Sequence, residues 1–276
     1  MYNDLKGKVA LITGSGKRSG IGFAIAEKLA INGAHIVVAD IGEDVQDGSG
    51  LTYGTSAEME ELANELNRKF GVETMTVPLD VTSDPSIDAA HQSIMDRFKV
   101  LDILINNAGA AFGAPSPIKD YDVEAWDKTM DVNVTGILRL SKKLLPTLIE
   151  RQGSIVNMSS TAAKGPNSYM GAYSCAKISV IMMTKVIAKE LGPSNVRVNA
   201  ICPGIIMTDL QILRIELEAK NRGITPEERR RQLEESIPLQ KIADPSAVAS
   251  LAAFLVSEES SYISGQAINV CGGRTL

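Results

Sequence analysis

The chain has 276 residues, 44% of them hydrophobic, with 28 Lys and Arg against 33 Asp and Glu and a net charge of −5. This composition is typical of a globular protein with a large core, and it gives no reason to expect binding to nucleic acid or to an anionic membrane. No apolar run reaches the roughly 18 residues of a membrane-spanning helix. The first residues, MYNDLKGKVALIT, lack the pattern of a secretion signal, so we expect a cytoplasmic protein.

Cysteine and histidine are too few to build the usual metal or nucleophilic sites. The three cysteines form no CxxC pair, and there are only two histidines, His35 in an apolar run and His91 in an amphipathic stretch. The sequence therefore predicts no metal site, no disulfide framework and no Ser-His-Asp mechanism.

Short β-branched runs alternate with longer helical patterns along the whole chain. Strands are predicted at 8–13, 35–40, 72–79, 102–106, 154–159, 196–202 and 267–270, and helices at 20–32, 57–69, 85–98, 122–150, 169–191 and 245–257. This alternation predicts an α/β fold: a doubly wound (Rossmann), mostly parallel sheet of seven strands with helices on both faces. In such folds, ligands bind at the carboxyl ends of the strands.

Two segments interrupt that rhythm. Residues 41–56 predict a loop that is longer than a strand-to-helix turn needs. Residues 208–240 predict short helices just after a strand, where they could form a lid over a ligand; a solvated surface hairpin is the alternative. No linker or repeat divides the chain, so we expect a single domain, 1–276.

The stretch TGSGKRSGIG, residues 13–22, lies between the first predicted strand and the first predicted helix. Glycines there allow a tight turn and a close approach to a pyrophosphate, which the helix N-terminus then binds. A glycine-rich turn is a weak signal alone, and its position strengthens it.

Asp40 ends the second predicted strand, where an acidic residue accepts the ribose 2′-hydroxyl of NAD and repels the 2′-phosphate of NADP. Lys17 and Arg18 in the glycine loop favour NADP instead. Because Asp40 is placed for the more direct contact, we expect NAD as cofactor, with NADP less favoured. Lys17 and Arg18 are then expected to be exposed, or to pair with the pyrophosphate or with acids in 41–50.

Tyr173 and Lys177 stand four apart in a helical pattern and therefore on one helix face. An ammonium beside a phenol lowers the phenol pKa, and such a pair can exchange a proton with an alcohol oxygen. This spacing is common by chance, so its meaning depends on the residues around it.

Those surroundings resemble the short-chain dehydrogenase/reductase family, in its compact one-domain branch, along nearly the whole chain. The resemblance is based on motifs in the family's order: the glycine loop 13–22, Asp80-Val81, the NNAG segment 106–109, DVNVTG at 131–136, Ser159-Ser160, Tyr173 with Lys177, and Pro203-Gly204. Three features depart from it: five residues separate Gly14 from Gly20 where the family usually has three, the loop after Asp40 is long, and Cys271 precedes Gly272-Gly273.

The resemblance implies a role for each matching residue. Tyr173 is the general acid/base, Lys177 tunes Tyr173 and bonds the nicotinamide ribose, Ser160 bonds the substrate oxygen, and Asn133 holds a relay water or stabilises a helix kink. Asn106 is expected on the adenosine side of the cofactor. The cofactor-binding set implied is Gly14, Gly16, Ser19, Gly20, Ile21, Asp40, Asp80, Val81, Asn107, Ala108, Gly109, Tyr173, Lys177, Pro203, Gly204, Ile206 and Thr208. Thr208 serves equally well as a helix N-cap.

The function implied is the interconversion of a secondary alcohol and a ketone by hydride transfer with NAD(P). The substrate is a small alcohol or ketone, such as a polyol or sugar, a 3-oxoacyl thioester or a hydroxysteroid. Pocket positions are expected for Ala111, Phe112, Met170 and Met207, and no charged residue stands out as a substrate anchor. The alternatives are a sugar-nucleotide epimerase or dehydratase and a non-catalytic dinucleotide sensor. A homo-oligomer, a dimer or tetramer assembled through 122–150 and 169–191, is a further implication of the resemblance.

Overall fold

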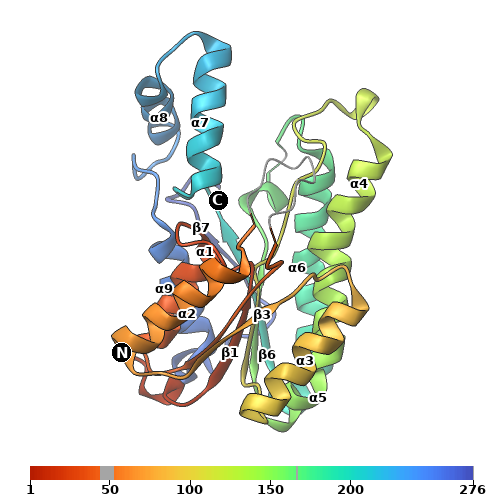
Figure 1. Cartoon of the computed structure of the whole chain (residues 1–276). Coiled ribbons are helices and arrows are strands. Elements are labelled where there is room, and N and C mark those ends of the chain that lie inside the picture. The colour runs from red at the N-terminus through yellow and green to blue at the C-terminus, as the bar shows by residue number, and fades with distance from the viewer. Residues whose placement is uncertain (44–52, 166, 276) are drawn as a thin grey trace.

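The computed structural model describes residues 1–43, 53–165 and 167–275 and contains one seven-stranded sheet (Figure 1). The strands are β1 (Val9–Thr13), β2 (His35–Asp40), β3 (Thr74–Pro78), β4 (Ile103–Asn106), β5 (Ser154–Met158), β6 (Arg197–Pro203) and β7 (Ala267–Val270). Their order is β3-β2-β1-β4-β5-β6-β7, and every neighbouring pair is parallel. The order reverses between β1 and β4, which predicts a ligand crevice at their carboxyl ends.

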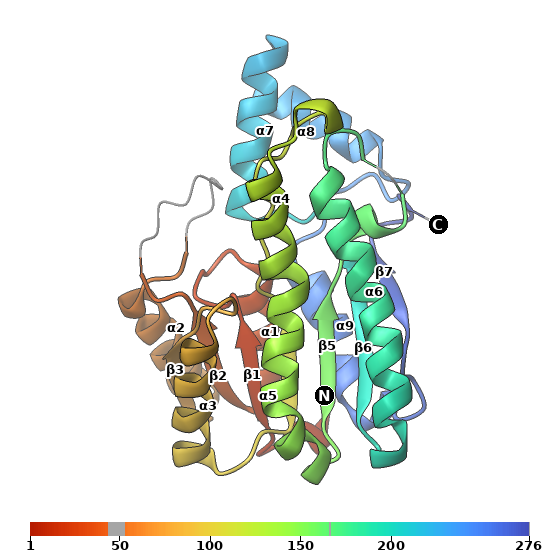
Figure 2. The same ribbon diagram turned by 90° about the vertical axis from the view of Figure 1, so that its right-hand side faces the viewer.

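Helices cover both faces of the sheet, as Figures 1 and 2 show. The helices α1 (Ile21–Ala30), α2 (Ser56–Phe70) and α9 (Pro245–Val256) share one apolar core with the sheet. On the other face, α3 (Asp84–Phe98), α5 (Gly136–Glu150) and α6 (Gly171–Leu191) share a second core. The predicted fold is confirmed, and each predicted strand and helix is found with its ends shifted by a few residues.

The segment expected as one helix over 122–150 contains a local change of pitch. It consists of α4 (Val123–Met130), a π-helical turn at Asp131–Thr135, and α5. The side chain of Asn133 in the turn donates from Nδ2 to the carbonyl of Thr129 at 2.8 Å and to that of Ala110 at 2.6 Å. The π turn thus fixes Asn133 against the loop that follows β4.

Two helices, α7 (Asp209–Arg222) and α8 (Pro226–Glu235), form a hairpin that projects beyond the carboxyl end of the sheet (Figures 1 and 2). Thr208 caps α7, Gly223 ends it in the left-handed region at φ 66°, and Thr225 with Pro226 starts α8. The hairpin closes on a small apolar cluster of Ile215, Leu233, Ile237 and Ile242. The predicted helical segment 208–240 is therefore a hairpin on the ligand side of the sheet.

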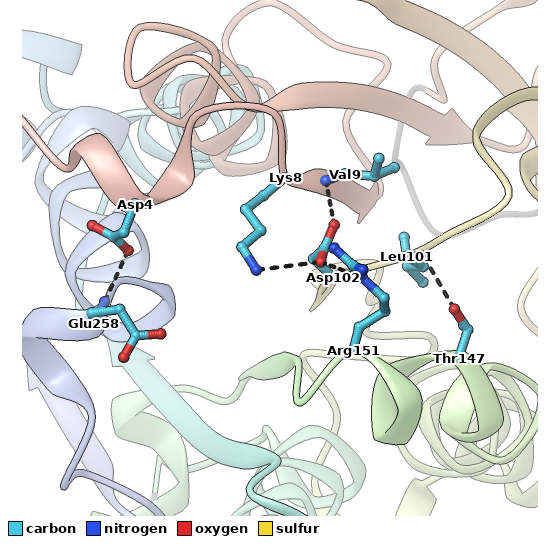
Figure 3. Close-up of polar contacts among 8 residues, drawn as sticks. All are labelled: Asp4, Lys8, Val9, Leu101, Asp102, Thr147, Arg151 and Glu258. Atoms are coloured by element: carbon cyan, nitrogen blue, oxygen red, sulfur yellow. Dashed lines mark hydrogen bonds and ion pairs between the residues drawn. The ribbon is translucent and has the colours of Figure 1, made fainter.

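At the opposite, amino end of the sheet, a buried carboxylate joins three segments (Figure 3). Asp102, only 2% exposed, accepts from the N–H of Val9 at 2.9 Å, from Arg151 Nε at 3.0 Å and from Lys8 Nζ at 3.4 Å. A buried charge needs such partners to offset its loss of hydration. Asp102 therefore ties β1 and the end of α5 to the start of β4.

The predicted loop 41–56 has ends that meet: Gly42 donates its N–H to the carbonyl of Gly54 at 3.0 Å. Residues 44–52 of that loop lie outside the described residues. Among the described helices, Gly171–Ser194 alone has the length and apolarity of a membrane span, and it packs on β6 as a core helix does.

Candidate active site

A cleft of about 450 Å³ opens at the carboxyl ends of β1, β2 and β4. Among its lining residues are eleven of the predicted cofactor set: Gly14, Ser19, Gly20, Ile21, Asp40, Asp80, Val81, Asn107, Ala108, Gly109 and Thr208. The glycine loop and the NNAG segment, far apart in sequence, therefore lie side by side at the β1–β4 reversal and both line the crevice.

The glycine loop leaves the backbone exposed to this cleft. Gly14 has φ 63°, and a Cβ added there would come within 3.1 Å of Ala108 Cα. A Cβ on Gly22 would lie 2.3 Å from the carbonyl oxygen of Gly14, so only glycine lets α1 begin this close to β1. No side chain caps α1 at Gly20, which leaves the first N–H groups of α1 for a ligand. This cradle fits a pyrophosphate.

Asp40 lies at the edge of the cleft with both carboxylate oxygens engaged. Oδ2 accepts from the N–H of Gly16 at 2.9 Å, and Oδ1 accepts from that of Ile41 at 2.9 Å. Burial raises the pKa of the Asp40 carboxyl, and the N–H donors and the charge of Lys17 oppose that rise. Asp40 is thus both an anion beside the cleft and an anchor for the glycine loop.

Gly16 does not line the cleft, contrary to its predicted cofactor contact. Its Cα packs against Gly54, where an added Cβ would come within 2.8 Å of both Gly54 Cα and Asp40 Cβ. The extra residues between Gly14 and Gly20 explain the difference, because they carry Gly16 sideways onto the end of β2. Gly16 thus holds the glycine loop against Gly54 and Asp40, on the side away from the cleft.

The two loop cations also differ from expectation in their partners. Lys17 Nζ is paired with Glu58 at 2.8 Å, and Arg18 is paired with Glu65 at 2.5 Å. Arg18 is exposed, as expected, and Lys17 is half-buried. Both acids lie on α2, whereas the pairing partners expected were the pyrophosphate or acids in 41–50. Both cations are therefore engaged in ion pairs with α2, although Lys17 also lines the cleft.

A second hollow, of about 350 Å³, adjoins the cleft at the ends of β5 and β6. It is lined by Ser160, Tyr173, Lys177, Pro203, Gly204, Ile206, Ala111 and Met170, as predicted. Phe112 and Met207 were expected there but do not line it. Phe112 is buried, with its N–H bonded to Thr129, and Met207 packs on the apolar cluster under the α7–α8 hairpin.

The Tyr173 and Ser160 hydroxyl groups lie close to each other inside this hollow. The Ser160 oxygen accepts the N–H of Ala162 at 3.1 Å, which leaves its own proton to donate. Burial raises the pKa of the Tyr173 phenol, while the Ser160 hydroxyl and the charge of Arg214 lower it. The direction of the pKa shift differs from expectation, because burial outweighs the Ser160 hydroxyl and the Arg214 charge.

Lys177 is buried next to Tyr173. Its Nζ lies 5.5 Å from the centre of the Tyr173 ring and donates to the carbonyl of Met158 at 3.0 Å. Burial lowers the Lys177 pKa to about 8, since the ammonium loses its hydration. The amine therefore changes charge within the working pH range of an enzyme.

Asn133 lies behind the hollow, beside Lys177. A Cβ on Gly109 would be 2.7 Å from Asn133 Oδ1 and 3.1 Å from Lys177 Nζ, so both atoms flank the Gly109 backbone. Asn133 Oδ1 is buried and has no hydrogen-bond partner among the described residues. An unpaired acceptor near an ammonium is a suitable place for an ordered water.

The two asparagines of NNAG have different roles. Asn107 donates from Nδ2 to the carbonyls of Thr13 and Gly14, both at 2.9 Å, and lines both hollows. Asn106, expected on the adenosine side, is instead buried inside the sheet, where it donates to Asn157 Oδ1 at 2.8 Å. The alternation of strand residues turns Asn106 away from the ligand.

Sequence reasoning missed several lining residues. Ile41 and Tyr53 line the cleft near Asp40, and Gln211, Arg214 and Arg274 line the catalytic hollow. None belongs to a motif. For Gln211 and Arg214, the available signal was that they stand one helical turn apart in the predicted lid, which places them on the same helix face.

Comparisons with known proteins agree with this geometry. A family model described as enoyl-(acyl carrier protein) reductase matches residues 14–275. The chain is 36% identical over 271 residues to 3-oxoacyl-(acyl-carrier-protein) reductase FabG of Aquifex aeolicus, over 98% of each chain. The solved L-sorbose reductase of Gluconobacter frateurii, complexed with NADPH and L-sorbose, has a TM-score of 0.88 at 34% identity, over 99% of this chain and 98% of that one. An NAD+-bound xylitol dehydrogenase has a TM-score of 0.85 at 30% identity, over 98% of this chain and 99% of that one.

The fold, the site and these relatives define an oxidoreductase of the NAD(P)-dependent type. The chain belongs to the short-chain dehydrogenase/reductase family.

Proposed function

We propose that this protein interconverts a secondary alcohol and a ketone, with Tyr173 as the general acid/base. One observation supports this most directly: Ser160, Tyr173 and Lys177 gather in a hollow that shares its wall with the glycine-loop cleft. Ile21, Asn107, Gly109, Ala110, Thr208 and Leu210 line both spaces. A ligand in the cleft can therefore reach the Tyr173 oxygen.

The nicotinamide dinucleotide supplies the hydride acceptor or donor when it is bound. The glycine loop and the start of α1 would hold its pyrophosphate, and Asp80 and Val81 its adenine. Pro203, Gly204 and Ile206 would flank the nicotinamide.

In the oxidative direction, Tyr173 takes the proton of the substrate hydroxyl. Ser160 can donate its proton to the same substrate oxygen, because its contact with the Ala162 N–H uses the oxygen as acceptor and leaves the O–H free. A positive Lys177 favours the phenolate form of Tyr173. A water held between Asn133 Oδ1 and Lys177 would offer the proton a route away from the hollow.

The deciding experiment measures absorbance at 340 nm with NAD and NADP against secondary alcohols and ketones. The Tyr173→Phe variant should lose activity by at least about 10³-fold and still bind cofactor. Tyr262→Phe is the matched control, since Tyr262 is fully exposed at the other end of the sheet, and it should keep full activity. Unchanged turnover in Tyr173→Phe would refute the mechanism.

The same assay separates the alternatives. Cofactor binding without turnover of any alcohol or ketone would favour a dinucleotide sensor. Turnover of a sugar nucleotide without net change at 340 nm would favour an epimerase or dehydratase.

For the cofactor, we propose a preference for NAD over NADP. The support is a carboxylate at the edge of the cleft, with the loop cations already paired to α2. Asp40→Asn should lower the NAD over NADP selectivity by about tenfold, since roughly 1.4 kcal/mol of repulsion is removed. Lys17→Ala and Arg18→Ala should change it by less than about threefold. A wild-type preference for NADP would overturn the assignment.

For the substrate, we propose a polyol, sugar or 3-oxoacyl compound, on the strength of the names of the relatives. We also propose a single-domain, metal-free cytoplasmic enzyme that assembles as a dimer or tetramer. Leu138, Ile178, Met182 and Val186 on α5 and α6 expose large apolar side chains, which favours burial against another copy. Light scattering with size-exclusion chromatography should give a mass above the 29.5 kDa of one chain.

A further inference from the structure

The catalytic hollow is markedly positive, a property that the hydride-transfer site does not require. Three cations line it: Lys177, Arg214 and Arg274. Among the described residues lining this hollow, none is Asp or Glu. Lys177 already serves Tyr173, so two guanidinium groups remain without a task in the proposed reaction.

Arg214 lies on α7, one turn after Leu210 and beside Gln211 on the lining face. Its ion pair among the described residues is with Glu218, which Nε contacts at 2.9 Å. Glu218 is shared, because Arg229 contacts its other oxygen at 2.7 Å. One carboxylate between two guanidiniums leaves a net positive charge, and the terminal nitrogens of Arg214 make no hydrogen bond within the described residues.

Arg274 reaches the same hollow from the C-terminal segment. Gly272 and Gly273 have φ of 62° and 86°, and the turn they form packs under the α7–α8 hairpin, where Leu239 donates its N–H to the Gly272 carbonyl at 3.1 Å. A Cβ on Gly272 would lie 2.6 Å from Ile237, so the turn has one close-packed position. The Arg274 side chain makes no ion pair or hydrogen bond within the described parts of the chain.

The charge of Arg214 acts on the reacting group itself, since it is one of the influences that lower the Tyr173 pKa. An anion held by Arg214, whose side chain is 58% exposed, would therefore lie at the open mouth of the hollow, within electrostatic reach of the phenol. Guanidinium groups bind carboxylate and phosphate through paired N–H donors, which gives orientation as well as affinity.

We propose that the substrate of this enzyme carries an oxyanion, a carboxylate or a phosphate, which Arg214 and Arg274 bind while Ser160 and Tyr173 act on the hydroxyl or carbonyl. This inference rests on the proposed function and narrows it from secondary alcohols in general to hydroxy acids, their keto acids or sugar phosphates. The two arginines are specificity-determining residues that line the same hollow as Ser160.

The test uses matched substrates with the full-length enzyme and its preferred cofactor. The pairs are 3-hydroxybutyrate with its methyl ester, and D-gluconate with D-glucitol; D-glucitol 6-phosphate tests the phosphate. For at least one pair, the anion should have kcat/KM about tenfold or more above its neutral partner. That advantage should shrink as the salt concentration is raised from about 0.02 M to about 0.5 M, because salt screens charges at an open site. A carboxylate advantage without a phosphate advantage identifies the acid, and the reverse identifies the phosphate.

Variants then assign the effect to the two side chains. Arg214→Gln and Arg274→Gln should each raise KM for the anion about tenfold, and KM for the neutral partner should change far less. Because the Arg214 charge also lowers the Tyr173 pKa, Arg214→Gln should in addition shift the pH profile of kcat to higher pH for both partners. Arg214→Lys should restore part of the loss. Arg222→Gln, an exposed arginine on the same helix, is the control and should match the wild type.

Two outcomes are distinguishable from each other. If neutral alcohols are used as well as the anions, with activity that Tyr173→Phe abolishes, the inference is wrong and the proposed function stands. If no alcohol or ketone of either kind is turned over, the proposed function fails and this inference fails with it. An anion preference that survives in the double variant would also overturn the assignment to these arginines.

Discussion

The two ends of the sheet carry hollows of opposite character: one of about 470 Å³ at the amino end, and the cleft of about 450 Å³ with its adjoining hollow of about 350 Å³ at the carboxyl end. At the amino end, the buried or half-buried charged groups already have partners: Asp102 with Lys8, and Arg197 with the carbonyls of Leu255, Ser257 and Ser260. At the carboxyl end, Asn133 Oδ1, the start of α1 and the Arg214 and Arg274 guanidiniums are incompletely satisfied. Volume alone does not identify a site; unsatisfied polar groups aimed at the space do.

After Tyr173→Phe, the largest effect should come from the carboxyl end and be confined to activity. Ser160→Ala removes a donor to the substrate oxygen, and we expect kcat/KM to fall about 10²–10³-fold. The melting temperature should change little, because the Ser160 side chain is only half-buried. Steady-state kinetics and thermal melts on one preparation test this. Equal losses of activity and stability would show that the residue is structural.

The converse change is at the amino end and should affect stability only. Asp102→Ala leaves the Val9 N–H buried without its acceptor and removes the anion between Lys8 and Arg151. We expect a loss of about 2–4 kcal/mol in the free energy of unfolding. Asp120→Ala, at an exposed ion pair with Lys119, should cost less than about 0.5 kcal/mol. Chemical denaturation gives both values.

At temperatures where the Asp102→Ala variant is folded, its kcat should equal that of the wild type. A reduced kcat would mean that the amino end is coupled to catalysis, and the contrast between the two hollows would then be too simple.

The smallest effect is a pH dependence from Lys177. Its pKa is lowered from 10.5 to about 8 in the folded protein, so the unfolded chain binds the proton more tightly. Below pH 8 the buried ammonium therefore destabilises the fold by a constant amount, and this penalty disappears as pH rises from 8 to 10.5. Lys177→Met should be more stable than the wild type by about 1–3 kcal/mol at pH 7, after the lost bond to Met158 is allowed for. The gap should narrow by pH 10; denaturation at both pH values measures it, and a constant gap would exclude the linkage.

The sequence predicted the sheet, the covering helices and most of the site because each depends on local pattern. Strand–helix alternation gave the topology, and the motifs gave Ser160, Tyr173 and Lys177, which the structure brings into one hollow. Gly16 and Asn106 were misplaced because the direction of a side chain or a backbone turn depends on neighbours distant in sequence, such as Gly54 and Asn157.

The charge of the catalytic hollow could not be predicted at all. Arg214 comes from the α7–α8 hairpin and Arg274 from the C-terminal segment, and neither belongs to a motif. They line the same hollow because the Gly272 turn packs against Ile237. For the same reason, the ion pairs of Lys17 and Arg18 could not be predicted from local sequence, since Glu58 and Glu65 lie on α2, beyond β2 and the loop 41–56.

The π-helical turn at Asp131–Thr135 has a geometric consequence for the long helix that contains it. One residue advances an α-helix by about 100°, so one extra residue rotates everything before it relative to everything after it. Upstream, the Thr129 hydroxyl can thus face inward to accept the Phe112 N–H, while downstream Leu140 and Leu144 still face the sheet. The π turn therefore changes the rotational register of the helix, so that the parts before and after it pack against two different neighbours.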